Sequence, residues 1–455
     1  MPRFAVIAAL ATLVSPLGAQ DTRTVAEPKI PPACATLDAS LVPVGDTTLA
    51  DADEGRLDTD RIQRAIDGCA AGRAVVLKAD GPRRAFLGGP LKLRPGVTLV
   101  VDSGAILFGS RDPEVYATSA GSCGVRKEGA RGCRPLIAVD RADHAGVMGG
   151  GTIDGRGWAT MAGQTISWWD LAQQARTGPP QQNPRMIQTN GSNDFTLYGI
   201  TLRNSPNFHV VFDRGDGFTA WGVKIHTPSP NARNTDGIDP AGATNVTITR
   251  SWILTGDDNV AIKGGSAKTT HVTVSHNHFY RGHGMSIGSE TNAGVERVLV
   301  TDLTVDGADN GLRIKSNASR GGLVSNVTYE NVCIRKTKEP IFMDTHYSAS
   351  PQTTGTLIPV FRDIVLRNVR VLDAGRITLD GYDAERRLGI TLDGVTFDDV
   401  ATVKLKASHA DVTLGAGGTN LPIAGDDVKM TGPAVRKDAA AAPSCEGRFA
   451  PFPVR

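Results

Sequence analysis

The sequence predicts an all-β protein: a right-handed, single-stranded parallel β-helix with a short helix at its N-terminal end. Three observations support this fold class. Short segments that alternate apolar and polar side chains return along the chain and end on Asn, Asp or Gly, as β-strands do. The steps between equivalent positions are 23, 28, 26, 26 and 29 residues, the period of a solenoid. The 52 glycines exceed average usage and indicate many turns. The equivalent positions are Phe195, Phe218, Val246, Val272, Val298 and Val327.

Two other repeat architectures fit this pattern less well. A propeller blade has four strands and about forty residues, more than one step supplies. A leucine-rich repeat would show Leu and Asn at regular positions, which the segments do not have. In a parallel β-helix each coil adds one strand to each of several parallel sheets, and Val, Ile and Phe fill the interior.

Both ends of the chain differ from the repeat. Residues 1–19 carry the basic Arg3, continue with an apolar run and end in small residues, as a secretory signal peptide does. We expect a secreted protein cleaved near Ala19, a β-helix over 20–430 and an irregular tail over 431–455. The segment 57–72 predicts a helix that covers the open end of the stack, capped by the side chain of Asp58 or Thr59. The residues on its apolar face are Ile62, Ala65, Ile66 and Cys69.

Composition excludes two classes of partner. The formal net charge is +2 with 21% charged residues, so no strongly basic surface is available for nucleic acid. No later segment approaches eighteen consecutive apolar residues, so no membrane span is expected. We expect a monomer.

The six cysteines predict disulfides, because the chain is expected to be exported. Sequence alone leaves fifteen possible pairings. The pairing that nearness along the chain favours is Cys34–Cys69, Cys123–Cys133 and Cys333–Cys445.

Acidic side chains gather in two motifs, NTDGIDP at 234–240 and GDDNVAIK at 256–263. Unpaired carboxylates are costly to bury, so they either face water in turns or belong to a site. Asp236 precedes Asp257 by 21 residues and Asp258 by 22, which is about one coil. Side chains one coil apart lie on neighbouring rungs, about 4.8 Å from each other.

Basic residues continue the same stripe. His283, in GHGMSIGSE, lies 26 residues after Asp257, and Arg313 lies 30 residues after His283. Arg313 and Lys315 share one face of a strand because side chains alternate. For the same reason, the adjacent Asp257 and Asp258 would point to opposite faces unless a bulge intervenes.

This set of residues suits hydrolysis of a glycosidic bond between acidic sugars. The reaction needs a proton donor for the leaving oxygen and a carboxylate that activates water or attacks. Neighbouring carboxylates raise one another's proton affinity, so one can stay protonated while another is ionised. Arg and Lys would bind the carboxylate of the sugar.

Each motif taken alone has a simpler interpretation. Asp beside Gly is most often a turn residue, and His283 alone is more often structural. A calcium site is a further alternative, weakened by the nearby Arg and Lys. A calcium-dependent pectate lyase with Arg as its base would be the neighbouring enzyme class. The coincidence of all six residues on one stripe favours the hydrolase.

The four motifs NTDGIDP, GDDNVAIK, GHGMSIGSE and RIK (313–315), in this order, resemble the polygalacturonases of glycoside hydrolase family 28. SWWDLA (167–172), NPRMIQ (183–188) and NFHVVF (207–212) look like the endopolygalacturonases that bacterial plant soft-rot pathogens secrete. The likeness runs from about residue 21 to 415. It implies a β-helix that hydrolyses the α-1,4 bonds between galacturonates of pectin with inversion, without a metal or other cofactor.

The resemblance also implies a role for each residue. Asp257 would be the general acid, Asp236 and Asp258 would activate water, and His283 would support the protonation state of the acid. The residues that would bind the substrate are Arg313, Lys315, Tyr347 and Asn234.

Endo action is expected because no separate domain that would block the groove is evident in the sequence. Exo action, or a polysaccharide-binding β-helix without activity, stays an alternative. In the segment 155–185, Trp158, Trp168 and Trp169 are expected to cover the β-helix rather than to stack on sugars.

Overall fold

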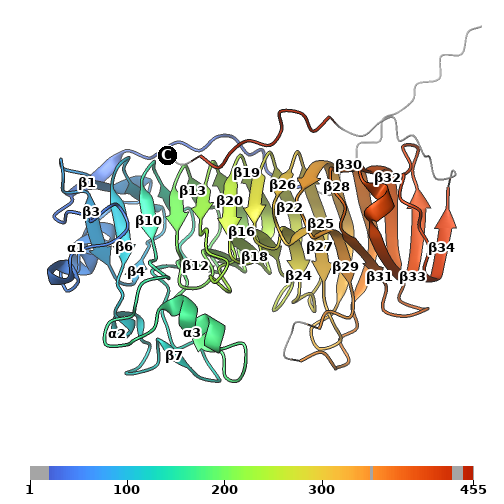
Figure 1. Ribbon diagram of the computed structural model, residues 1–455. Coiled ribbons are helices and arrows are strands. Elements are labelled where there is room, and N and C mark those ends of the chain that lie inside the picture. The colour runs from blue at the N-terminus through green and yellow to red at the C-terminus, as the bar shows by residue number, and fades with distance from the viewer. Residues whose placement is uncertain (1–19, 349–351, 433–443, 454–455) are drawn as a thin grey trace, which may run out of the picture.

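The computed structural model describes residues 20–348, 352–432 and 444–453. The predicted signal peptide lies outside these residues. The described chain forms an elongated stack of coils in which 32 strands pair in one continuous ladder (Figure 1). The pairings of this ladder are parallel, so each coil adds strands to the same faces of the stack.

Three series of strands run the length of the stack. The first series contains β1 (Ala33–Asp38), β2 (Arg73–Lys78), β5 (Val97–Val101), β9 (Gly146–Met148), β13 (Phe195–Tyr198), β16 (Asp216–Trp221), β19 (Thr244–Thr249), β22 (Thr269–Ser275) and β25 (Val295–Thr301). The second contains β3 (Ala85–Gly88), β6 (Ile106–Gly109), β10 (Thr152–Asp154), β14 (Thr201–Arg203), β17 (Lys224–His226), β20 (Trp252–Thr255), β23 (His278–Arg281) and β26 (Thr304–Asp306). The third contains β4 (Leu91–Lys92), β8 (Ile137–Asp140), β12 (Ile187–Asn190), β15 (Val210–Asp213), β18 (Ile238–Ala241), β21 (Val260–Ile262), β24 (Met285–Gly288), β27 (Asn310–Lys315), β29 (Glu339–Asp344) and β31 (Arg376–Asp380).

Longer strands close the C-terminal end. β28 (Leu323–Arg335) pairs with both β25 and β26, so it serves the first and second series at once. The strands that follow are β30 (Val360–Val371), β32 (Leu388–Phe397), β33 (Lys404–Leu414) and β34 (Asp426–Thr431). This continuous stack of parallel strands confirms the predicted parallel β-helix.

The strand register confirms the predicted period. Phe195 pairs with Phe218, and Phe218 with Val246. The ladder continues through Val272, Val298 and Val327. Each of these side chains is fully buried and belongs to one continuous core. The predicted equivalent positions are therefore the same position on successive coils.

A bend precedes that core position on every coil of this part of the stack. The residue before it has a positive φ of about 50–90°, a backbone region that Gly, Asn and Asp tolerate best. The residues are Asp194, Gly217, Asn245, His271, Arg297 and Asn326. The frequent Asn, Asp and Gly of the repeat thus mark the corners of the coils, as the sequence predicts.

Helix α1 (Thr59–Asp67) covers the N-terminal end, as predicted, and buries Ile62 and Ile66. The predicted side-chain cap is wrong. The carboxylate of Asp58 instead accepts from the backbone N–H of Leu87, and the hydroxyl of Thr59 accepts from that of Gly89. These two N–H groups lie at the edge of the stack, and leaving a buried N–H without an acceptor would be costly.

A lobe projects from the stack between β6 and β12 (Figure 1). The lobe holds α2 (Pro113–Tyr116), α3 (Trp168–Gln174) and an antiparallel pair, β7 (Val125–Arg126) with β11 (Gln181–Gln182). Trp168 and Trp169 are buried, and the indole of Trp169 donates to Ser205 O, which confirms their covering role. Trp158 is 43% exposed, so the covering role predicted for it is wrong.

Both ends of the described chain lie along the outside of the stack (Figure 1). Near the N-terminus, Asp21 bonds Thr273 and Thr247 on the first series. Near the C-terminus, the Tyr280 hydroxyl donates to Ala450 O, and the ring of Phe452 lies 4.9 Å from that of His226.

Three disulfides hold the chain, and no described cysteine is free. The pairs are Cys34–Cys69, Cys123–Cys133 and Cys333–Cys445, the pairing that nearness along the chain favours. No helix among the described residues is long and apolar enough to cross a membrane.

Candidate active site

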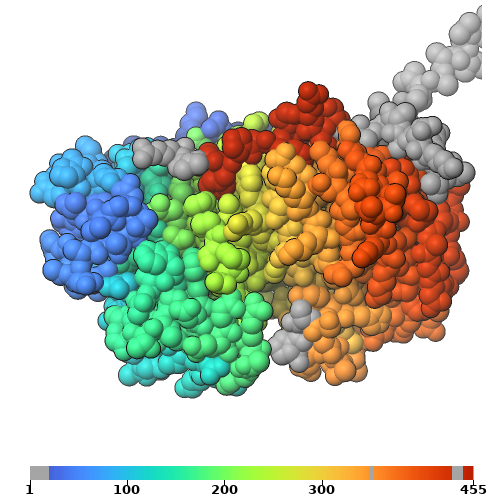
Figure 2. All heavy atoms as spheres, in the orientation of Figure 1, coloured from blue at the N-terminus to red at the C-terminus, as the bar shows by residue number. Residues whose placement is uncertain are grey.

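An open groove of about 850 Å³ runs across the third strand series. The predicted aspartates and His283, which directly precede β18, β21 and β24, line the groove, as does Lys315 of β27. Arg176, which follows α3, lines one side, and Tyr347 lines the other. The surface is hollowed between the α3 lobe, in green, and the loop that follows β29, in orange (Figure 2).

Three predicted residues occupy the same place on successive rungs. Each stands two positions before a residue of the register that joins Ile238 to Val260 and Val260 to Met285. Neighbouring parallel strands are about 4.8 Å apart, so these side chains lie one above the other. The residues are Asp236, Asp258 and His283.

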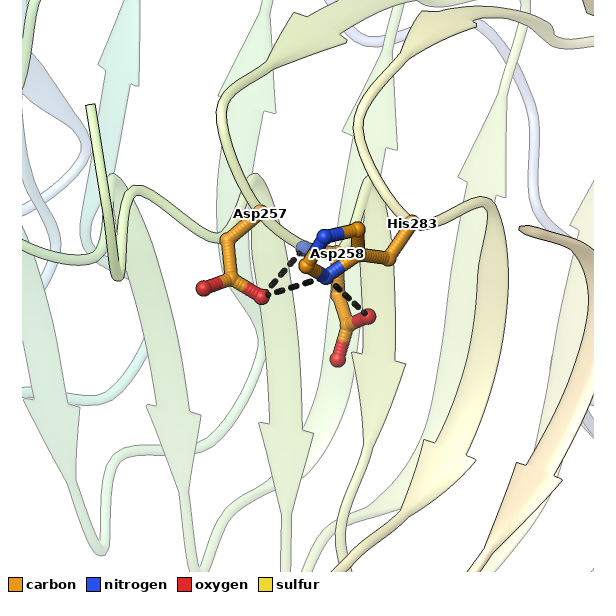
Figure 3. Close-up of side chains that lie close together, drawn as sticks. All are labelled: Asp257, Asp258 and His283. Carbon is orange, nitrogen blue, oxygen red and sulfur yellow. Dashed lines mark hydrogen bonds and ion pairs between the residues drawn. The ribbon is translucent and has the colours of Figure 1, made fainter. Parts of the chain in front are cut away.

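Asp257 forms a pair with His283 (Figure 3). The Nδ1 atom of His283 lies 3.1 Å from Asp257 Oδ1. The other carboxylate oxygen, Oδ2, accepts from the backbone N–H of Asn234 at 3.1 Å. The His283 Nε2 atom lies 3.7 Å from a carboxylate oxygen of Asp309, which lines the same groove.

Asp258 is held by cations. Arg313 donates to its Oδ1 at 3.1 Å, and Lys315 Nζ lies 2.8 Å from its Oδ2. Ser286 adds a hydroxyl donor to Oδ1 at 2.8 Å. Asp258, Arg313 and Lys315 are all nearly buried, so this ion cluster is shielded from solvent screening.

The prediction that Asp257 and Asp258 point to opposite faces is wrong. His283 Nδ1 lies 3.8 Å from Asp258 Oδ1 as well as 3.1 Å from Asp257, so both carboxylates face one imidazole (Figure 3). The alternation rule fails because the two aspartates lie in the turn before β21, not on the strand.

The charges on this side of the site are well matched. Burial works against ionisation of Asp257, but His283 lowers the pKa of its carboxyl below the usual value. Burial likewise opposes the charge of Asp258, whose pKa is lowered by Lys315 and Arg313. Asp257 in turn raises the pKa of His283, against the effect of burial. Both shifts favour a charged Asp257 carboxylate and a proton on the imidazole of His283 in the free site.

Asp236 has the opposite environment. Burial raises the pKa of its carboxyl well above the usual value, and the neighbouring charges of Asp239 and Asp257 raise it further. Lys263, whose Nζ lies 3.5 Å from Asp236 Oδ2, lowers it. The three aspartates therefore differ in proton affinity, as the chemistry of bond hydrolysis requires.

Comparison with known proteins identifies the family. The model of glycosyl hydrolases family 28 matches residues 109–414. The chain belongs to this family. A polygalacturonase from Ralstonia solanacearum is 42% identical over 467 aligned positions, covering 91% of this chain and 87% of the relative. An endo-polygalacturonase from Pectobacterium parmentieri is 44% identical over 391 positions, covering 85% of this chain and 92% of the relative.

A solved structure agrees with this family 28 assignment. The polygalacturonase from Erwinia carotovora ssp. carotovora superposes with a TM-score of 0.77 at 41% identity, covering 90% of this chain and all of that one. The protein is therefore a glycoside hydrolase with the parallel β-helix fold of that enzyme.

Two further residues named from the sequence line the groove of this family 28 hydrolase. The Tyr347 hydroxyl lies 3.5 Å from an Arg313 nitrogen, and the Tyr347 ring centre lies 5.4 Å from Lys315 Nζ. Asn234 contributes its backbone N–H to Asp257, while its side-chain oxygen accepts from Gln181. Tyr347 is thus placed to contact a ligand held by the two cations, whereas Asn234 chiefly positions Asp257.

Sequence reasoning missed Asp239, Lys263 and Ser286 in this site. Lys263 lines the groove, and its Nζ lies 2.9 Å from Oδ2 of the buried Asp239. A signal was available, since Asp239 and Lys263 belong to the two acidic motifs and lie 24 residues apart, about one coil. Ser286 carries no such signal, because serine is common on solvated strands.

Two groups of described residues have ligand atoms within 4.8 Å of one another, the spacing of a metal site. In the group Asp257, Asp258 and His283, nitrogen donors already contact the carboxylate oxygens, and they compete with a cation. The second group, Asp344, His346 and Asp380, lies further along the third series, and His346 there bonds Asp380.

Proposed function

We propose that this family 28 hydrolase is a secreted endo-polygalacturonase that cleaves the α-1,4 bonds of homogalacturonan with inversion of configuration. One observation carries the proposal: three aspartates and a histidine line an open groove together with Lys315, and Arg313 is bonded to Asp258 beside it. Carboxylates supply the acid and base of glycoside hydrolysis, and the cations supply recognition of a uronate.

The leaving oxygen needs a proton, and the Asp257–His283 pair holds one. A substrate that excludes water from the groove disfavours two separated charges, so the proton moves from His283 Nδ1 to Asp257 Oδ1, 3.1 Å away. Asp257 then protonates the glycosidic oxygen as the bond to the sugar breaks. The general-acid role that the family resemblance implies for Asp257 thus fits a carboxyl that is ionised in the free site.

Asp236 and Asp258 serve the water. Asp258 is kept ionised by its two cations, and Asp236 has a buried oxygen, Oδ1, to which no described residue donates a hydrogen bond. A water held between these carboxylates loses a proton to one of them as its oxygen bonds the anomeric carbon. No aspartate bonds the sugar, so the configuration inverts.

Arg313 and Lys315 bind the carboxylate of the substrate. Both form salt bridges to Asp258 in the free protein and contact Tyr347, and Lys315 lines the groove. Three disulfides are consistent with a protein that works in an oxidising compartment outside the cell. Endo action is supported by the endo-polygalacturonases of Pectobacterium, which are 43–44% identical to the chain.

Product analysis on polygalacturonate tests the proposal. Early samples should contain oligomers of mixed length, whereas monomer or dimer alone would mean exo action. Unsaturated products would mean a lyase, and an absence of cleavage would leave a polysaccharide-binding β-helix. Proton NMR of the first product should show the β-anomer released from the α-linked polymer. An initial α-anomer would require a nucleophilic aspartate and would exclude the water-activating role of Asp236 and Asp258.

A further inference from the structure

Lys263 bridges two buried carboxylates at the edge of the site. Its Nζ lies 2.9 Å from Asp239 Oδ2 and 3.5 Å from Asp236 Oδ2. The position is fixed from both sides, because Asp239 is on β18 and Lys263 directly follows β21, the next strand of the series. The Lys263 ammonium also lies 4.4 Å from the centre of the Phe208 ring, an additional favourable contact for a cation.

The charges that face Asp236 are mostly negative. Three come from other aspartates, and among the described residues Lys263 is the cation whose nitrogen lies within 4.0 Å of the Asp236 carboxylate. Arg185, which precedes β12, interacts electrostatically with Asp236 from a longer distance. Glu290, which follows β24, interacts in the same way with Lys263. His209 contacts the backbone oxygen of Asp236 and not its carboxylate. The three aspartates are Asp239, Asp257 and Asp258.

We propose that Lys263 is a positioning residue of the hydrolase, which favours the ionised form of Asp236 and orients it toward the attacking water, and that Asp239 shares this lysine with Asp236. The inference rests on the water-activating role of Asp236 in the proposed function. It assigns a task to a lysine and an aspartate that the two acidic motifs contain but that the reaction itself does not use.

The physical reason is the cost of a buried charge. A carboxylate of Asp236 that is buried among three other aspartates would take up a proton and could no longer accept one from water. Asp258 does not face this difficulty, because Arg313 and Lys315 hold it ionised. Protonation of Asp236 therefore sets the acid limb of the pH profile, below which activity falls. Lys263 lowers the pH at which this limb lies.

The pH profile of kcat/KM on polygalacturonate tests this inference with two substitutions of opposite sign. Lys263→Met keeps much of the side-chain length and removes the charge, so the acid limb should move to higher pH by about one unit or more. Activity below that limb should fall at least about tenfold. Asp239→Asn removes a negative neighbour of Asp236 and leaves Lys263 to Asp236 alone, so the acid limb should move to lower pH.

Controls separate charge from structure. Lys263→Arg should restore the acid limb toward the wild-type position, because the cation is retained. Lys268→Met removes a lysine that pairs with Glu296 outside the groove, and it should leave the profile unchanged. Circular dichroism checks that each variant is folded. If Lys263→Met does not fold, the downward shift of Asp239→Asn and the profile of Lys263→Arg still decide the question.

The outcomes distinguish this inference from the proposed function. An equal loss of kcat/KM at every pH in both variants, with the acid limb unmoved, would overturn the role of Lys263. Asp236→Asn measures the proposed function separately. If Asp236→Asn is inactive while the limb of Lys263→Met stays in place, only the inference fails. If Asp236→Asn keeps normal activity, the water-activating role of Asp236 fails as well.

Discussion

Asp257 and Asp258 are neighbours in the sequence, but their side chains have different partners. Asp257 bonds an imidazole that can exchange a proton with it, whereas Asp258 bonds the basic side chains of Arg313 and Lys315. A carboxyl that is to donate a proton must regain it, and only Asp257 has a partner from which it can do so. The division of roles between the two aspartates therefore follows from their partners rather than from their positions on a strand.

Asp257→Asn should reduce kcat on polygalacturonate by about 10²–10⁴-fold, the usual contribution of a general acid. The amide cannot carry the proton of the pair, although it keeps the size of the side chain. Asp398→Asn is the matched control, since Asp398 pairs with Arg370 on the surface outside the groove, and its kcat should stay within about twofold. A nearly normal kcat for Asp257→Asn, in a folded protein, would remove Asp257 from the reaction.

Lys315→Ala should raise KM for polygalacturonate and reduce the preference for free over methyl-esterified polymer. The ammonium of Lys315 lines the groove, and esterification removes the carboxylate that such a cation recognises. Lys315 also holds Asp258, so kcat should fall too, but the change in the substrate preference reports binding alone. Equal rates of the wild type on free and fully esterified polymer would contradict a uronate site at Arg313 and Lys315.

The stripe of six charged residues could be predicted from the sequence, because the four motifs that contain them follow one another at about the period of one coil. The contacts of Lys263 could not, because they depend on the strand register and on how far a long side chain reaches across a rung. The direction of Asp257 could not be predicted either, since the boundary between the turn and β21 decides it.

Helix α1 illustrates how an element that lies away from the groove supports it. A solenoid has no closed core, so its first coil needs a cover against water. Ile62 and Ile66 of α1 are fully buried against this coil. Their helical spacing made α1 predictable, whereas α3 has only seven residues, and too few turns for a periodic pattern. The Ser167–Asp170 capping box marks its start in the structure.

Ile66→Ala should lower the free energy of unfolding of the N-terminal coils by about 2–5 kcal/mol, the cost of a cavity left by a buried isoleucine. Guanidinium chloride titration followed by circular dichroism measures the change in midpoint. Ile30→Ala is the matched control, because Ile30 is 48% exposed and its loss should change stability by less than about 0.5 kcal/mol. Equal midpoints for the two variants would mean that α1 does not cover the stack.

The molecule as a whole is a stack in which each coil contacts chiefly its neighbours, and the chain ends add the long-range ties. The disulfide Cys333–Cys445 joins residues 112 positions apart, and the segment after it follows the second series back to His226. The sequence predicted an irregular tail fixed through Cys445, and it gives no pattern for the path beyond that point. Contacts such as Tyr280 with Ala450 depend on where the stack places the strands.

Because coils can unfold locally, loss of this disulfide should lower the stability of the coils that the tail contacts. In the variant Cys333→Ala/Cys445→Ala, amide hydrogen exchange should become faster in β20, β23, β26 and β28, and stay unchanged in β4 and β8 near the other end. By loop entropy, a disulfide that closes roughly a hundred residues stabilises the folded protein by about 5 kcal/mol, and one that closes about 15 residues by about 3 kcal/mol. Hydrolysis of polygalacturonate at 25 °C should persist, since the groove lies on the third series.

The matched control for the tail is Cys123→Ala/Cys133→Ala, which opens a loop of only 10 residues in the lobe that holds α3. It should leave exchange in β20, β23, β26 and β28 at the rate of the intact protein, because the lobe contacts different coils. Uniformly faster exchange along the whole stack in the Cys333→Ala/Cys445→Ala variant would mean that the coils unfold as one cooperative unit. The tail would then stabilise the entire β-helix rather than the coils that it covers.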